Sequence, residues 1–316
     1  MAKRVEQITL GIDVSKDKLD SYHWEREECL SLANERAPIR AWLKGLSGPV
    51  RIALEPTSTY HLVVVEEAVA LGIKVYLVNP RQLVHYREAV NQRNKTDPDD
   101  AWLLGRFLAH EHSQLRPFQP QCRQAQQLWA LLKRRAVVVS ARKQLTQSLA
   151  GINLSARALF TQMTRVLERI DRRMQALVKA LHWTQAYQRC LSIPGIGPLN
   201  AAALVTAYHR GAFASSDAFV AYLGLDVRVR ESGRFTGMRK LTKRGEAELR
   251  RLLYCAAASS RSYPRFGQYY QRQLEKGLPK TAANVILGRK LARIAFALIR
   301  NEQSFNHDLL KACSMP

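Results

Sequence analysis

The sequence predicts an α/β domain, then a long helical segment, then a mainly α-helical domain. Three observations indicate this order. Apolar strand patterns alternate with a helix near the amino terminus, a polar run with helical periodicity occupies the middle, and the last part combines short helical patterns with basic loops. Of the 316 residues, 47% are hydrophobic, which is enough to form the cores of two domains. We place the three parts at residues 1–112, 113–184 and 185–316.

The amino-terminal part shows a strand–helix–strand pattern. The run at 73–80 is almost continuously apolar, as a buried strand should be, and Gly72 stops the helix before it. A last helix starts near Thr96, where Pro98 fits the first turn. The expected elements are strands from Ile8 to a turn at Ser15, at 50–56 and at 73–80, and helices at 61–72 and 96–110. Together they predict a layered α/β domain.

The rest of the chain is predicted to be helical. Residues 110–121 contain two prolines and few apolar side chains, which indicates a linker. Residues 123–181 are interrupted only by Gly151 and predict two long helices, in an antiparallel or intermolecular coiled coil. A further helix is expected to start at Leu241. The helix expected at 280–300 has a predicted core face of Val285, Ile286, Leu291, Ile294 and Leu298.

Charge divides the chain sharply. The formal net charge is +23, from 49 basic and 26 acidic residues. Residues 1–110 hold 15 of each sign, so the whole excess lies in the remainder. Clustered Lys and Arg favour a polyanionic partner, because binding releases counterions from the phosphates. A purely solubilising surface charge is the alternative. A membrane-surface role is disfavoured, because the basic residues are spread over several segments.

Other features of the composition point to a soluble, intracellular protein. No stretch approaches the ~20 apolar residues of a membrane span, and the amino terminus lacks the apolar core of a signal peptide. The five cysteines lie far apart, with the spacing of neither a zinc site nor a disulfide framework, which suits a reducing compartment. We therefore expect no membrane partner and a cytoplasmic location.

Four carboxylates form the most informative pattern. Asp13 and Glu55 each end a predicted strand, and Asp97 and Asp100 share one face of the following helix. If they converge, their repulsion raises their pKa values, and Mg²⁺, or Mn²⁺ in its place, relieves it through hard oxygen ligands. Two such ions ~4 Å apart stabilise both oxygens of a phosphoryl displacement. Alternatively, Asp13 is a turn residue and Asp97 a helix N-cap.

Three motifs carry a family resemblance. They are G-I-D-V-S-K-D at 11–17, L-E-P-T-S-T-Y at 54–60 and N-K-T-D-P-D-D-A at 94–101. In order and spacing they resemble the acidic blocks of the DEDD transposases, the Piv-like recombinases of the IS110 insertion-sequence family. The resemblance implies a RuvC/RNase H-like fold for 1–112 and identifies the four carboxylates as catalytic metal ligands. The middle block has Pro-Thr-Ser-Thr-Tyr where many relatives have Ala-Thr-Gly-x-Tyr.

The basic part contains two candidate contacts to nucleic acid. A Pro-Gly-Ile-Gly turn at 194–197 lies between helical stretches, and such a hairpin can bind phosphate through backbone N–H groups or merely join two helices. The DEDD transposases carry a similar hairpin. Between 228 and 251, nine Lys/Arg face three Glu. The residues predicted to bind nucleic acid are Lys95, Gly195, Gly197, Arg228, Arg230, Arg234, Arg239, Lys240, Lys243 and Arg244.

Ser232 lies in the basic, glycine-punctuated run, which is expected to be an exposed loop or hairpin. A serine hydroxyl is a weak nucleophile unless a base or metal activates it and cations neutralise the phosphate. By its surroundings alone it is an ordinary loop serine. The resemblance matches Glu-Ser-Gly at 231–233 to the catalytic serine of the DEDD recombinases, which implies a covalent phosphoserine–DNA intermediate. Thr236 and Thr242 are weaker candidates.

These observations predict a transposase or DNA recombinase that excises and inserts a mobile element. Its partners would be the element ends and target DNA, and its two sites would form a composite centre within or between chains. The long helices suit a homo-oligomer, a dimer or tetramer. The resemblance also implies a structured guide or bridge RNA, and a nucleoid-associated protein of a prokaryote. The alternatives are a RuvC-like structure-selective endonuclease that hydrolyses junction DNA, with Ser232 structural, and a non-catalytic nucleic-acid-binding protein.

Overall fold

The chain folds into two compact units in a computed structural model that describes residues 7–92, 96–152, 154–228, 231–232, 235–237, 239–306 and 308. The first unit is Met1–Pro120 and the second is Gln121–Pro316. The long helices of the middle segment belong to the second unit, together with the basic carboxyl-terminal part. Each unit has its own hydrophobic core.

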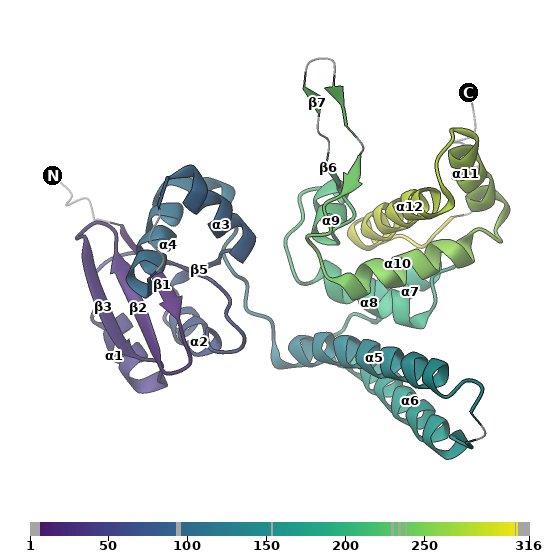
Figure 1. The fold of residues 1–316 in the computed structure, drawn as a ribbon, viewed down its shortest axis with the longest axis horizontal. Coiled ribbons are helices and arrows are strands. Elements are labelled where there is room, and N and C mark those ends of the chain that lie inside the picture. The colour runs from purple at the N-terminus through teal and green to yellow at the C-terminus, as the bar shows by residue number, and fades with distance from the viewer. Residues whose placement is uncertain are drawn as a thin grey trace. The chain divides into compact units, whose positions relative to one another are not determined.

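A mixed five-stranded sheet forms the centre of the first unit (Figure 1). The first three strands form an antiparallel meander, and the first, fourth and fifth run parallel to one another. The strand order is β3-β2-β1-β4-β5, with β1 at the centre. The strands are β1 (Ile8–Val14), β2 (Lys18–His23), β3 (Glu28–Ala33), β4 (Val50–Leu54) and β5 (Lys74–Leu77).

Helices cover both faces of this sheet. Alternation along β4 divides the core: Ile52 and Leu54 pack on α1 and α2, whereas Ala53 packs on α3 and α4. The helices are α1 (Arg36–Lys44), α2 (Leu62–Ala70), α3 (Pro80–Ala89) and α4 (Asp97–Glu111). The layered α/β prediction is confirmed, and α4 begins after Thr96 as expected. The strand β3 and the helices α1 and α3 were not predicted.

The segment predicted as a linker remains attached to the first unit over much of its length. After α4 comes a short 3-10 helix, His112–Gln114, and the backbone then passes along β5. There the N–H of Phe118 donates to the carbonyl of Val75 at 2.6 Å, and the Phe118 ring packs against the core under α1 and α2. The change from one unit to the other falls just beyond, after Pro120.

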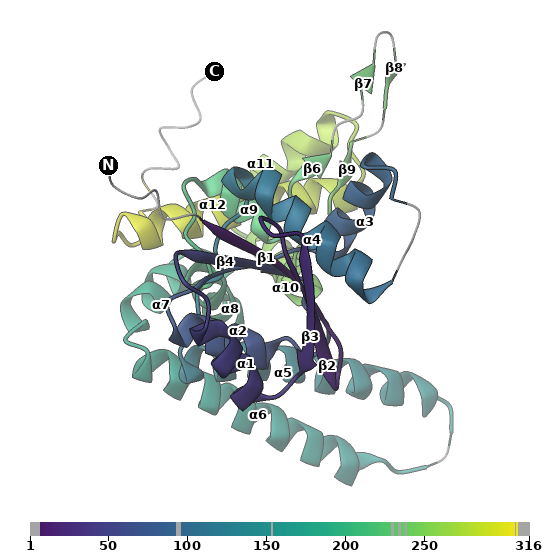
Figure 2. The same ribbon diagram turned by 90° about the vertical axis from the view of Figure 1, so that its left-hand side faces the viewer.

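Two long helices open the second unit. They are α5 (Arg123–Ser148) and α6 (Arg157–Ala180), which pack side by side as a pair (Figure 2). Arg135 of α5 binds Asp171 of α6 through two hydrogen bonds, of 2.6 and 3.0 Å. At one end of the pair, Leu132 and Leu177 enter the core of the second unit. The two predicted helices are confirmed, and their pairing between chains stays a prediction.

In the described part of the second unit, five further helices surround α12. They are α7 (Thr184–Leu191), α8 (Pro198–Tyr208), α9 (Ser216–Tyr222), α10 (Ala247–Ser260) and α11 (Pro264–Glu275), and α12 itself is Lys280–Arg300. Of the core face predicted for α12, Leu291 is buried, Val285, Ile294 and Leu298 are partly buried against the core, and Ile286 is outside the core cluster. The fully buried face also contains small residues such as Gly288 and Ala292, which were not predicted. Gly288 would place a Cβ 3.4 Å from the carbonyl of Leu253, so α10 and α12 approach closely there.

A slender hairpin protrudes from the helices of this unit (Figures 1 and 2). At its base β6 (Val227–Arg228) pairs with β9 (Lys240–Leu241), and further out β7 (Glu231–Ser232) pairs with β8 (Phe235–Thr236). The helix predicted from Leu241 begins only at Ala247, because β9 occupies its expected start. None of the helices that the structure describes is long and apolar enough to cross a membrane.

Candidate active site

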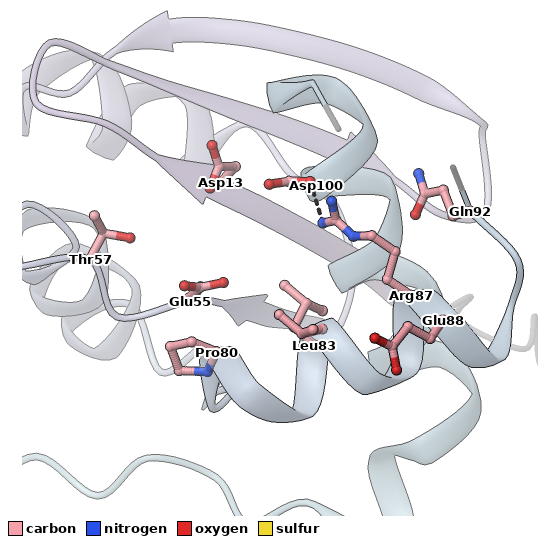
Figure 3. A pocket seen from close by; sticks show the side chains of 10 residues that line it. Asp13, Glu55, Thr57, Pro80, Leu83, Arg87, Glu88, Gln92 and Asp100 are labelled. Carbon is pink, nitrogen blue, oxygen red and sulfur yellow. Dashed lines mark hydrogen bonds and ion pairs between the residues drawn. The ribbon is translucent and has the colours of Figure 1, made fainter. Parts of the chain in front are cut away.

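Three of the four predicted carboxylates line one pocket of the first unit (Figure 3). The parallel register pairs Ile12 of β1 with Leu54 of β4. The next residues along the two strands, Asp13 and Glu55, therefore lie side by side at the strand ends. Asp100, in the first turn of α4, faces them. The cavity has a volume of about 390 Å³, and its other lining residues are Thr57, Pro80, Leu83, Val84, Arg87, Glu88 and Gln92.

A glycine lets α4 approach β1 closely enough to place Asp100 there. Gly11 lies in the middle of β1, where α4 crosses the sheet. A Cβ on Gly11 would lie 2.0 Å from the carbonyl oxygen of Ala101 and 2.2 Å from the backbone nitrogen of Gly105. The glycine of the G-I-D motif therefore serves a close backbone approach.

The pKa of Asp13 is raised by its burial and by the other three carboxylates. Burial is the main factor that raises its pKa from 3.8 to about 6. The negative charges of Asp100, Asp97 and Glu55 add to the rise in pKa, and a hydrogen bond from the backbone of Val14 opposes it. A carboxyl group that is partly buried beside like charges ionises reluctantly. The pocket thus favours either a proton or a cation at Asp13.

The two carboxylates of α4 are each held by a basic side chain. Nη2 of Arg87, from α3, contacts Oδ1 of Asp100, and both side chains are mostly buried, at 17% and 18% exposure. Nζ of Lys18 lies 3.0 Å from Oδ2 of Asp97. Asp97 is 53% exposed and does not line the pocket. The expected convergence of four carboxylates is therefore seen for three of them, with Asp97 beside the group.

The carboxylates of the pocket have the chemistry that a hard divalent cation requires, but their present positions do not form a metal site. Carboxylate oxygens are the ligands that Mg²⁺ and Mn²⁺ prefer. Among the residues that the structure describes, however, no three His, Cys, Asp or Glu side chains are placed to share one ion. The contact of Asp100 with Arg87 occupies one of its oxygens. A metal that bound this oxygen would displace the contact with Arg87.

The other residues of the acidic motifs have structural roles. Oδ2 of Asp99 accepts a hydrogen bond of 2.6 Å from Oγ1 of Thr96, and Asp99 does not line the pocket. Thr96, not Asp97, is the N-cap of α4. Ser58 has a positive φ of 47°, at the position where many DEDD relatives have glycine. The loop after β4 therefore keeps a left-handed turn without the glycine.

Sequence reasoning missed Arg87 and Lys18, the two basic groups of this site. A signal for Arg87 was present: Asn79 caps a helix that has Pro80 in its first turn, and Leu83 and Arg87 then share one face. Recognition of α3 would have placed Arg87 near the strand ends. Lys18 has no comparable signal, because its approach to Asp97 depends on how α4 crosses the sheet.

We expect Asp13→Asn to stabilise the metal-free protein at pH 8 and to have little effect at pH 4. Because folding raises the pKa of Asp13, the folded state binds its proton more tightly, and stability falls as pH rises through about 6. The shift from 3.8 to about 6 corresponds to at most about 3 kcal/mol, an upper limit for a partly solvated group. Urea unfolding with a chelator at both pH values measures it. An equal effect at both would contradict the assigned pKa shift.

The predicted serine and basic residues lie on and beside the protruding hairpin. Ser232 is exposed and stands opposite Phe235 in the β7–β8 register. Arg228 and Lys240 are exposed and face each other in the β6–β9 register, where like charges repel unless an anion lies between them. Arg239, Lys243 and Arg244 are also exposed. Lys95, Arg230 and Arg234 lie outside the described residues.

The Pro-Gly-Ile-Gly turn joins α7 and α8, as the helical hairpin interpretation requires. Gly195 has a φ of 86°, and a Cβ there would lie 2.1 Å from Oγ of Ser260. That hydroxyl donates to the carbonyl of Pro194 at 2.8 Å, which fastens the turn to α10. Gly197 is the N-cap of α8, with open space around its Cα. Gly195 is thus required for packing, whereas Gly197 leaves the start of α8 accessible.

Comparison with known families identifies the chain. A family model for DEDD transposases of the IS110 type, described as "Transposase", matches residues 10–153. A second model, described as "Transposase IS116/IS110/IS902 family", matches residues 187–271. The chain belongs to the IS110 family of transposases. It is accordingly an enzyme, a DNA transposase or recombinase, and the first of the two matches contains all four acidic positions.

Individual relatives agree with this family. The chain is 26% identical over 317 residues to a pilin gene-inverting protein of Moraxella bovis, covering 94% of this chain and 97% of the relative. It is 33% identical over 144 residues to a probable family 20 transposase of Pseudomonas aeruginosa, covering 44% and 42% of the two chains. RuvC of T. thermophilus, solved with a Holliday junction, covers 35% of this chain and 99% of its own, with 13% identity and a TM-score of 0.26. That last likeness is too weak to support an argument.

Proposed function

We propose that this IS110-family transposase excises and inserts a mobile element with two chemical groups, a metal-binding acidic pocket and the nucleophile Ser232. The observation that carries the proposal is the meeting of Asp13, Glu55 and Asp100 in one pocket at the strand ends. The strand order of the sheet is consistent with the RuvC/RNase H-like fold that the family resemblance implies. The exposed serine on a basic hairpin is the second component.

The acidic pocket would hold a divalent cation, Mg²⁺ or Mn²⁺. Asp13, Glu55 and Asp100 are its proposed ligands, with Asp97 able to join them from the same helix. When bound, such a cation would neutralise the charge that develops on the phosphate and its departing oxygen. The raised pKa of Asp13 supports this role, because a cation would compensate for the burial and the neighbouring negative charges that raise it.

Ser232 would form a covalent link to DNA. Its Oγ attacks the scissile phosphorus, the bond from phosphorus to one deoxyribose oxygen breaks, and the serine proton ends on that departing oxygen. The free hydroxyl of an incoming strand then attacks the phosphoserine, which restores the phosphodiester and the serine hydroxyl. Neither step hydrolyses the phosphodiester, so the strands can be exchanged without another energy source. The basic residues of the hairpin base support phosphate binding there.

The partners follow from charge and exposed surface. The basic excess after residue 110 supports DNA as the substrate, and it suits the structured guide RNA that the family resemblance implies. Large apolar side chains are exposed on α5, on α6 and between them, and they support assembly into a homo-oligomer through this pair. They are Val137, Ile152, Leu154, Leu159 and Val166.

The test is a covalent-adduct trap. The protein would be co-expressed with its whole element, so that any transcript is present, and incubated with end-labelled DNA of the element junction and Mg²⁺. After a denaturing quench, we expect a labelled protein–DNA band from the unaltered chain and none from Ser232→Ala. Removal of the attacking oxygen leaves no route to the phosphoserine, so the loss should be complete.

Ser262→Ala is the matched control. Ser262 is an exposed serine of the same unit, whose hydroxyl donates to the carbonyl of Ser259. Its adduct should equal that of the unaltered chain. Junction cleavage without any adduct, at the same rate in Ser232→Ala, would overturn the serine chemistry. That result would indicate hydrolysis by the acidic pocket alone.

A further inference from the structure

A positively charged side chain, that of Arg87, lines the acidic pocket. The guanidinium of Arg87 contacts Asp100 inside the pocket, at the carboxylate that a metal would need. Given the proposed function, on which this inference rests, we propose that Arg87 occupies Asp100 in the metal-free site, sets the metal affinity, and turns to a DNA phosphate when the metal takes the carboxylate. Arg87 would thus couple metal binding to substrate binding.

Burial makes this contact the important one of the two on α4. The side chains of Arg87 and Asp100 are 17% and 18% exposed. Those of Lys18 and Asp97 are 49% and 53% exposed, and Lys18 is shared with Asp20 at the same 3.0 Å. Exposed pairs are screened by water and contribute little, whereas a pair shielded from water interacts strongly. A metal therefore competes mainly with Arg87, and Lys18 provides a matched comparison.

The guanidinium is incompletely satisfied in its present position. Its Nε is buried and has no hydrogen-bond partner among the residues that the structure describes. Arginine has five N–H donors in a planar fork, and buried donors without acceptors are unfavourable. Contact with a single carboxylate oxygen uses only part of that fork. Arg87 can therefore bind a second anionic group besides Asp100, or exchange Asp100 for another anion.

A phosphate of the DNA strand is the anion that fits. Guanidinium and phosphate match in a two-point contact, and arginine keeps its charge at any physiological pH. Three other carboxylates line the pocket, those of Glu55, Asp13 and Glu88. A cation at Asp100 would also bind Glu55 and Asp13. Glu88 directly follows Arg87 on α3, so it is already present beside Arg87 before any substrate binds. An incoming phosphate brings new negative charge to the pocket. Once a metal binds Asp100, the scissile strand would supply the acceptor that Arg87 lacks.

The first experiment measures Mn²⁺ affinity of the full chain without DNA, by electron paramagnetic resonance of the free ion. Arg87→Ala should bind Mn²⁺ about tenfold more tightly, because a competing charge is removed from a shielded site. Lys18→Ala should change the affinity by less than about threefold, since that contact is exposed. A residue that merely supported the fold would show the opposite sign, with weaker binding. Arg87→Gln, which keeps length and hydrogen bonding without charge, covers the case in which alanine unfolds the domain.

The second experiment measures affinity for junction DNA in Ca²⁺, over a series of salt concentrations. Arg87→Ala should weaken binding several-fold and lower the salt slope by about one, as expected for one lost phosphate contact. Arg87→Lys should restore most of the slope. Equal Mn²⁺ affinity in Arg87→Ala and the unaltered chain, or an unchanged salt slope, would overturn the inference. Failure of the proposed function looks different: the unaltered chain would bind no Mn²⁺, or Asp13→Asn would bind it equally well.

Discussion

Glu55→Gln is expected to reduce strand cleavage at the element junction by about a thousandfold, while Asp99→Asn leaves the rate within about threefold. Glu55 lies in the pocket beside Asp13, and its amide replacement keeps the volume but loses the charge that would hold a cation. Loss of one such electrostatic contact at a phosphoryl-transfer site removes a rate factor of about 10²–10³ or more.

Asp99 makes this comparison specific. It belongs to the acidic motif at 94–101 and carries the same charge as Glu55, but its carboxylate accepts from Thr96 and does not line the pocket. Cleavage would be measured on labelled junction DNA in Mg²⁺, with circular dichroism to establish that both variants fold. Equal losses in the two variants would mean that the total negative charge of the acidic motifs matters, rather than a position in the pocket. Full activity of Glu55→Gln would remove Glu55 from the active site.

The acidic positions could be predicted because they depend on local pattern. Asp13 and Glu55 follow apolar strand runs, and the parallel ends of neighbouring strands meet at one edge of a sheet. Asp100 lies in the first turn of a helix whose start is marked by Thr96 and Pro98. Such signals are short-range, so they can be recognised before the fold is known. The layered α/β unit and the two long helices could be predicted for the same reason.

Features that depend on packing between distant segments could not be predicted. The contact between Arg87 and Asp100 requires α3 and α4 to pack over the same end of the sheet. The buried face of α12 was predicted only in part, because its small residues were not expected to be buried. Where helices approach closely, Gly288 and Ala292 occupy the contact, and Val285 and Ile294 lie at its edge. Hydrophobicity alone does not reveal how near two backbones come.

Gly11→Ala is the substitution expected to damage the first unit most, by at least about 3 kcal/mol. Its new Cβ would lie 2.0 Å from a backbone oxygen and 2.2 Å from a backbone nitrogen of α4, and neither can turn away as a side chain could. The helix must move off β1 as a body. Asp100 moves with it, so the variant should lose cleavage even under conditions where it remains folded.

Hydrogen exchange followed by peptide mass spectrometry separates the two units in this experiment. Faster exchange is expected in β1 and α4, while α8 and α12 of the second unit keep their protection, because the clash is confined to the first core. Gly197→Ala is the control, since a Cβ there meets nothing within 4 Å. Unchanged protection of α4 in Gly11→Ala would mean that the helix does not cross β1 at this glycine. The placement of Asp100 beside Asp13 would then lose its structural basis, because that crossing is what brings the first turn of α4 to the strand ends.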